Sequence, residues 1–155
     1  MKQKKFKKAN SVYSTGIPGI DKQHQDLFLM CNALCDRLEN ETLSVEDSVN
    51  SLEGIVKCLK SHFATEQSLL DMIGFSGIKE HKKDHEKLCT RFMKEIKALE
   101  NKKHVDVHSF IIESRDILFN HVAVLDREYA DFTEELISLR KKYKITALKA
   151  RVLVD

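Results

Sequence analysis

Five histidines and one glutamate occupy stretches whose apolar spacing otherwise predicts buried helix faces. They are His24, His62, Glu66, His81, His85 and His121. A single histidine in such a place is more often a hydrogen-bonded core residue than a metal ligand. Burying a polar group without a partner, however, costs about 1–3 kcal/mol, and more if the group is charged. Histidines on several separate helices therefore need a common partner, and a metal cluster is the most economical one.

Two pairs within this set have the spacing of metal ligands. His62 and Glu66 are four residues apart, as are His81 and His85, so the members of each pair differ by about 40° around a helix. Each pair can bind one ion from one helix face. Neutral imidazole and ionised carboxylate are ligands that divalent first-row metals accept. The spacing therefore predicts metal binding.

Other polar residues are harder to assign from spacing. Asp126 lies five residues after His121, about 140° around an ideal helix, so a shared site would need a local π-type widening. An exposed acid beside Arg127 is the alternative, and spacing alone slightly favours it. His104 and His108 are also four apart, but they have few apolar neighbours and lie about 20 Å along the helix from His121. We interpret these two histidines as surface residues.

Four amphipathic helices are predicted to carry these side chains. The chain has only five glycines and one proline, and most of them fall between the helical patterns. The expected ranges are about 21–39, 45–72 after an N-cap at Ser44, 79–99, and from 106 onward. Short connections between helices of about 20 residues favour antiparallel neighbours. The predicted fold class is all-α: an antiparallel up-down-up-down four-helix bundle with an N-terminal arm and a C-terminal helical extension.

The organisation expected along the chain has three parts. Residues 1–20 form a basic tail and arm, residues 21–130 the bundle, and residues 131–155 the helical extension. In the extension Phe132, Leu136, Leu139 and Tyr143 recur at heptad spacing, either in a continuation of the fourth helix or in a short fifth one. Packing back onto the bundle is the simpler outcome. We therefore expect a monomer, with a dimer through the extension as the alternative.

Composition excludes several classes of partner and activity. The 26 Lys and Arg nearly balance the 24 Asp and Glu, so no nucleic-acid partner is expected. No apolar stretch predicts membrane insertion or a signal peptide, and we expect a cytoplasmic protein with four reduced cysteines. A zinc-protease motif, a phosphate-binding glycine loop and a nucleophile elbow are all missing from the sequence. We therefore expect no catalytic residues and no enzyme activity.

The sequence around the polar residues resembles the hemerythrin family, and its bacterial branch in particular. The resemblance rests on IDKQHQDLF around His24, HFATE at 62–66, HKKDH at 81–85 and HVAVLD at 121–126. The ordered pattern is His, His-x3-Glu, His-x3-His and His-x4-Asp, and it covers about residues 12–130. Every ligand position of the family pattern is filled. The resemblance thus implies that Asp126 joins the site, in contrast to its spacing alone.

Two iron ions, bridged by an oxo or hydroxo group, are the cofactor that this resemblance implies. The implied ligands are His81, His85 and His121 for one iron, His24 and His62 for the other, and Glu66 and Asp126 as bridges. The iron with two histidines would keep an open position for dioxygen. An apolar oxygen pocket of Phe63, Leu118 and Val122 is also implied. One departure concerns this pocket: the family usually has a tryptophan one turn before the fourth-helix histidine, where this chain has Ile117.

The implied function is reversible dioxygen binding for storage, transport or delivery. Ferritin-like di-iron bundles use four or more carboxylates, whereas five neutral imidazoles should favour the ferrous state and the release of oxygen. An oxygen- or redox-sensing signalling module is one alternative. A di-iron oxidase or peroxidase is the other, and it would need a proton donor near the open site.

Overall fold

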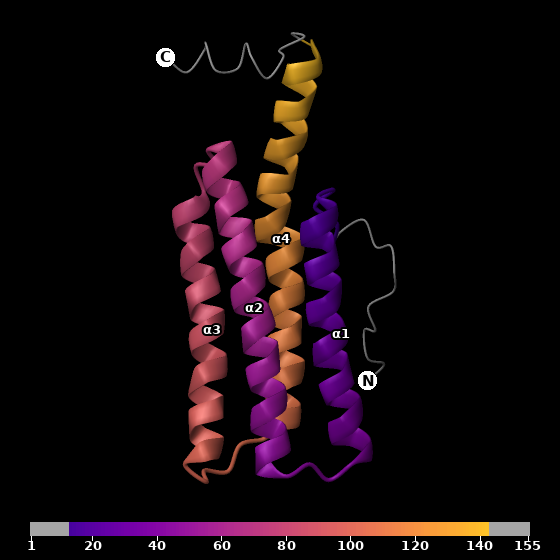
Figure 1. The fold of residues 1–155 in the computed structure, drawn as a ribbon, viewed down its shortest axis with the longest axis vertical. Coiled ribbons are helices and arrows are strands. Elements are labelled where there is room, and N and C mark those ends of the chain that lie inside the picture. The colour runs from indigo at the N-terminus through magenta and orange to yellow at the C-terminus, as the bar shows by residue number, and fades with distance from the viewer. Residues whose placement is uncertain (1–12, 143–155) are drawn as a thin grey trace.

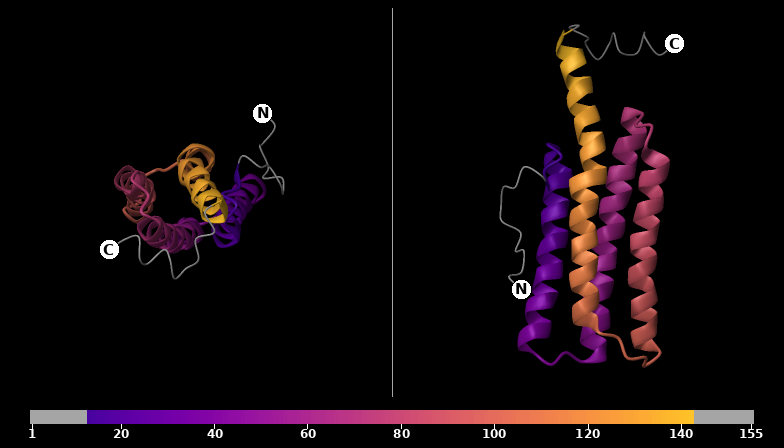
Figure 2. Two further views of the ribbon diagram at one scale, coloured as in Figure 1. Left: turned by 90° about the horizontal axis from the view of Figure 1, so that it is seen from above. Right: turned by 180° about the vertical axis from the view of Figure 1, so that it is seen from behind.

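The computed structural model describes residues 13–142 and folds them into four long helices (Figure 1). These are α1 (Pro18–Asn40), α2 (Val45–Ile73), α3 (Ile78–Glu100) and α4 (Val107–Lys142). Successive helices run in opposite directions, with α1 packed between α2 and α4, and α3 against α2 (Figure 2). Residues 13–142 contain no strand. The predicted all-α up-down-up-down bundle is confirmed.

Local signals explain where the first two helices begin. Pro18 occupies the first turn of α1, where its missing N–H is harmless, so α1 begins earlier than predicted. Asp21 then accepts hydrogen bonds from the Ser14 hydroxyl at 2.7 Å and from the Thr15 amide at 2.7 Å, which hold the preceding arm against α1. Ser44 caps α2 as predicted, in a reciprocal capping box with Asp47.

An aromatic turn closes one end of the bundle. Gly74 ends α2 with a φ of 68°, a left-handed conformation that favours glycine. A Cβ atom on Gly77 would lie 2.7 Å from the Phe75 ring, so glycine is needed for that ring to hold its place. The Phe75 ring lies 6.3 Å from that of Tyr129 and 5.8 Å from that of Phe132, between centroids. The α2–α3 turn is thereby packed against α4.

The fourth helix is longer than the others. It continues without a break to Lys142 and projects beyond the end of the bundle (Figure 1). The structure therefore shows a continuation of the fourth helix rather than a separate fifth helix up to Lys142. Leu136 and Leu139 of the projecting part are exposed. The predictions for residues 1–12 and for Tyr143 onward lie outside the described residues.

An apolar core fills the half of the bundle near the α1–α2 turn. It includes Phe28, Leu52, Leu59, Phe92, Ile96 and Ile111, all nearly inaccessible to solvent. All four cysteines are free; Cys31 and Cys35 are buried, and Cys58 and Cys89 are half-buried. None of the helices in the described range is long and apolar enough to cross a membrane.

Candidate metal centre

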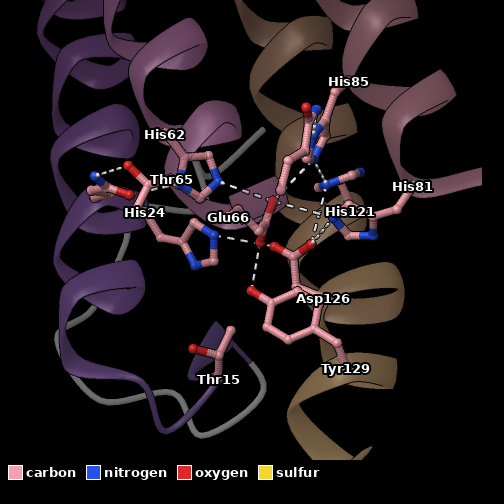
Figure 3. A network of polar contacts seen from close by, with 12 residues as sticks. Thr15, His24, His62, Thr65, Glu66, His81, His85, His121, Asp126 and Tyr129 are labelled. Atoms are coloured by element: carbon pink, nitrogen blue, oxygen red, sulfur yellow. Dashed lines mark hydrogen bonds and ion pairs between the residues drawn. The ribbon is translucent and has the colours of Figure 1, made fainter. Parts of the chain in front are cut away.

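Seven polar side chains from four helices converge near the opposite end of the bundle (Figure 3). They are His24 of α1, His62 and Glu66 of α2, His81 and His85 of α3, and His121 and Asp126 of α4. None of them is more than 6% exposed. The structure thus brings together every residue for which the sequence predicts a ligand role. Two subsets have ligand atoms within 4.8 Å of one another: one comprises Glu66, His81, His85 and His121, and the other His24, His62, Glu66 and Asp126.

The two carboxylates lie at the centre of this cluster, between the histidines. Glu66 Oε2 is 3.0 Å from His85 Nε2, 3.2 Å from His81 Nε2 and 3.7 Å from His62 Nε2. It therefore faces histidines of α2 and of α3. Because Glu66 belongs to both subsets, it occupies the position that a bridge between two ions requires.

Asp126 contacts the histidines of α1 and α4. Its Oδ2 lies 3.1 Å from His24 Nε2, and its Oδ1 lies 3.2 Å from His121 Nε2. The structure does not show the π-type widening that the spacing seemed to require, because α4 is an α-helix throughout. His121 instead faces His85 of α3, whereas Asp126 contacts His24 of α1 through Oδ2 and His81 of α3 through Oδ1, at 3.3 Å. Two residues that are about 140° apart around the helix axis can contact a central cluster from two sides. The interpretation of Asp126 as an exposed acid is wrong: it is 0% exposed.

Glutamine side chains orient two of the imidazoles. His62 Nδ1 lies 3.1 Å from Gln23 Oε1, and Gln23 Nε2 in turn donates to Thr65 Oγ1 at 3.4 Å. This places the proton of His62 on Nδ1 and leaves the Nε2 lone pair directed into the cluster, as a metal ligand requires. Gln67 Nε2 lies 3.0 Å from His85 Nδ1. If the side-chain amide of Gln67 is rotated by 180°, its Oε1 faces His85 Nδ1. His85 then carries its proton on Nδ1, as His62 does.

Burial and mutual contacts set the charges in the cluster. Burial lowers the pKa of His62 to about 4 and also lowers the pKa of His85, so both are neutral at pH 7. Burial alone would raise the pKa of Glu66, but hydrogen bonds with His81 and His85 hold it well below its usual value. The pKa of Asp126 is also lowered: burial opposes the shift, but its contacts with His121 and His24 outweigh it. For His121, burial opposes the shift, but its contact with Asp126 raises the pKa. The ionised carboxylates and the neutral imidazoles of His62 and His85 are in the protonation states that metal ions bind.

The donor set fits a pair of divalent metal ions. Buried atoms without a hydrogen-bond partner include His24 Nε2, His62 Nε2 and both carboxylate oxygens of Asp126. In addition, His85 Nε2 and His121 Nε2 face each other at 3.0 Å. Buried polar atoms are rarely left without partners, so this concentration of them in one place is an environment that bound cations would satisfy.

Tyr129 is a further member of the site that the sequence pattern did not reveal. Its side chain is completely buried, and its hydroxyl donates to Glu66 Oε1 at 2.5 Å. Burial is the main reason why its pKa is raised far above the usual value, and Glu66 and Asp126 add to the shift. Its position three residues after Asp126 on the inward face was an available signal, but a tyrosine at such a place is usually core.

Of the predicted pocket residues, Phe63 lies directly against the cluster. Its ring stacks on the His85 imidazole with centroids 3.7 Å apart and an interplanar angle of 10°. Leu118 and Val122 are buried on α4, each within one helical turn of His121. Whether these three side chains line an oxygen pocket stays a prediction.

The histidines interpreted as surface residues lie outside the cluster. His104 is exposed, and His108 lies half-buried with its Nε2 3.4 Å from Glu39 Oε1. Neither belongs to the metal-compatible groups found among residues 13–142.

Comparison with known proteins gives a consistent result. The model of the hemerythrin HHE cation binding domain matches residues 15–133. A bacteriohemerythrin of Methylococcus capsulatus is 28% identical over 120 residues, which cover 76% of this chain and 88% of the relative. A bacteriohemerythrin of Pseudomonas paraeruginosa is 30% identical over 125 residues, covering 81% and 80%. A myohemerythrin of Riftia pachyptila is 29% identical over 110 residues, covering 71% and 79%.

A solved crystal structure of a mutant protein has the same fold. It matches with a TM-score of 0.74 at 21% identity, covering 81% of this chain and 95% of its own.

Proposed function

This chain belongs to the hemerythrin family, and we propose that it binds dioxygen reversibly at a non-haem di-iron centre. One observation carries the proposal: five histidines direct Nε2 toward two buried carboxylates. A site with this many neutral ligands stabilises the ferrous state, which reversible binding needs. Storage, transport or delivery of oxygen follows as the use of such a centre.

The residues of the chain have distinct roles in this proposal. His81, His85 and His121 would hold one iron, and His24 and His62 the other, with Glu66 and Asp126 between them. When bound, the iron pair supplies the electrons that dioxygen takes up and returns. Gln23 holds His62 in the tautomer of a ligand.

In this proposal, apolar side chains beside the cluster exclude water from it. Phe63 covers one face of His85, while Leu118 and Val122 fill the core beside His121. An apolar wall withholds water and protons, and this slows irreversible oxidation of the metal. We therefore also propose that the protein is a carrier rather than an enzyme.

The test is anaerobic purification followed by cycles of oxygen addition and removal. We expect about two irons per chain and a visible charge-transfer band that appears with oxygen and disappears when oxygen is removed. Immediate oxidation without a reversible band would contradict the proposal and favour oxidase or peroxidase chemistry. A second anaerobic cycle on the same sample distinguishes slow oxygen release from irreversible oxidation.

A sensing role is a second candidate because of the length of α4. The helix that holds His121 and Asp126 continues to Lys142, outside the bundle (Figure 1). A rigid helix of this kind connects the cluster to a surface that a partner could contact. Removal of residues 134–155 tests this role: a carrier keeps its oxygen affinity and its biological effect, whereas a sensor keeps only the affinity.

A further inference from the structure

A groove between α3 and α4 leads from the surface to the candidate metal cluster. Its volume is about 250 Å³, and its lining comprises Asp84, Lys87, Leu88 and Arg91 of α3 and Ile117, Asn120, His121 and Leu125 of α4. The groove lies between two helices that each pack mainly against another neighbour, α3 against α2 and α4 against α1. One member of the cluster, His121, thus forms part of its wall.

The rest of the cluster is sealed. His121 is 6% exposed and His81 4%, whereas His24, His62 and His85 are at most 2% exposed and both carboxylates are 0% exposed. An ion cannot reach such a site from the surface without either a path or an opening of the bundle. Among the seven cluster residues, His121 is the one that lines this groove.

The charged side chains of the groove form two ion pairs, so the lining carries little net positive charge that would repel an approaching cation. Asp84 is the one acidic residue of the lining. The Lys87 ammonium lies 2.7 Å from Asp84 Oδ1. The Arg91 guanidinium is paired with Glu113 at 2.7 Å, so its charge is compensated outside the lining. Asp84 also acts electrostatically on His121.

We propose that this groove is the route by which divalent metal ions enter and leave the cluster, with Asp84 as the first ligand they meet and His121 as the second. A carboxylate at the mouth and an imidazole at the floor are both ligands that ferrous, cobaltous and zinc ions accept. Lys87 competes with the incoming ion for Asp84. The proposal rests on metal binding by the cluster, as in the proposed function, but it concerns the rate of exchange rather than the final occupancy.

Filling the groove is the first test. Ile117→Trp should slow both the uptake of Co(II) by the metal-free protein and its removal by a chelator, by roughly tenfold, or about 1.4 kcal/mol in barrier. Leu29→Trp is the matched control, because Leu29 is 52% exposed on α1 and Ile117 is 45% exposed. Both variants should still bind two metal ions at equilibrium. Equal rates in the two variants and the wild type would overturn the proposal and indicate exchange through opening of the bundle.

Charge substitutions at the mouth give a second, independent test. Asp84→Asn should slow Co(II) uptake by roughly threefold at low salt, and Lys87→Gln should accelerate it; both effects should shrink as salt is added. Asp71→Asn is the control. Asp71 Oδ2 lies 3.2 Å from Lys82 Nζ in a similar exposed ion pair that does not line the groove. If Asp84→Asn takes up Co(II) at the wild-type rate at low salt, Asp84 is not part of the route. A wild-type protein that binds no metal at equilibrium would instead refute the proposed function.

Discussion

The hydroxyl of Tyr129 lies 2.5 Å from Glu66 Oε1, while the other oxygen of the same carboxylate faces three histidines. Tyr129 thus fixes the rotation of the side chain that is placed to bridge two ions. The phenol also satisfies an oxygen that burial would otherwise leave without a partner.

Tyr129→Phe should keep the metal but alter its electronic properties. The ring still fills its place against Phe75 and His81, whereas Glu66 loses a charge-assisted hydrogen bond. We expect about two irons per chain, a shifted reduction potential, and a metal-free protein less stable by about 1–3 kcal/mol. Potentiometry and urea unfolding measure these changes. Tyr13→Phe, on a ring that packs against Phe119, should leave the potential unchanged, and an unaltered potential in Tyr129→Phe would show that the contact is only structural.

His62→Ala should abolish reversible oxygen binding. The variant removes one of the two histidines proposed for the open iron, so iron analysis should fall from about two toward about one per chain. His108→Ala is the control, because His108 lies outside the cluster beside Glu39. Reversible oxygen spectra in His62→Ala would contradict the ligand assignment.

Gln67→Glu should strengthen metal binding. A carboxylate at this position accepts a hydrogen bond from His85 Nδ1–H, which fixes the ligand tautomer and makes the imidazole a stronger donor. We expect roughly tenfold tighter binding of Co(II) in a chelator competition, and weaker binding in Gln67→Leu. The same affinity in both variants would mean that Gln67 does not orient His85.

Leu118→Ala should accelerate autoxidation. Leu118 is 3% exposed, and its loss would open the apolar wall beside His121 to water. Ile96→Ala, at an equally buried position in the distant apolar core, is the control for the loss of stability. If both variants autoxidise at the wild-type rate, Leu118 does not belong to the pocket wall.

The stability of the metal-free protein should fall as the solution is acidified below neutrality. Burial lowers the pKa of His62 from 6.5 to about 4, so between these values the unfolded chain takes up a proton that the folded chain does not. The stability of the folded state that depends on a neutral His62 is fully present above about pH 6.5, and it is lost as the pH falls toward about 4. At about pH 5 the loss should reach about 2 kcal/mol. Urea unfolding at two pH values should show this excess loss in the wild type relative to His62→Leu; equal losses would contradict it.

Most of the bundle could be predicted because its signals are local. Apolar periodicity, the Ser44 cap and the glycines near residue 74 each act within a few residues, and the helix bounds follow from them. The predicted start of α1 near Asp21 is too late, because the helix begins at Pro18. The structure shows that Asp21 lies inside the first turn and holds the preceding arm.

The site could be predicted only in part from spacing. Residues four apart share a helix face, so His62 and Glu66 were evident, whereas Asp126 needed the family pattern. The role of Asp126 depends on the positions of the helices that surround α4. The spacing of residues along a single helix gives no information about these positions. Tyr129 was missed for the same reason: its hydrogen bond to Glu66 spans two helices.

The cluster and the apolar core occupy opposite ends of the same four helices, and this separation has a consequence for biogenesis. The core end is held by apolar side chains such as Phe92 and Ile111, so its packing does not depend on a cofactor. The other end carries buried charges that only a bound metal satisfies fully. Under the proposed function, maturation would therefore tighten one end of a scaffold whose other end is already packed, and we expect the metal-free protein to show faster amide hydrogen exchange at the cluster end than at the core end.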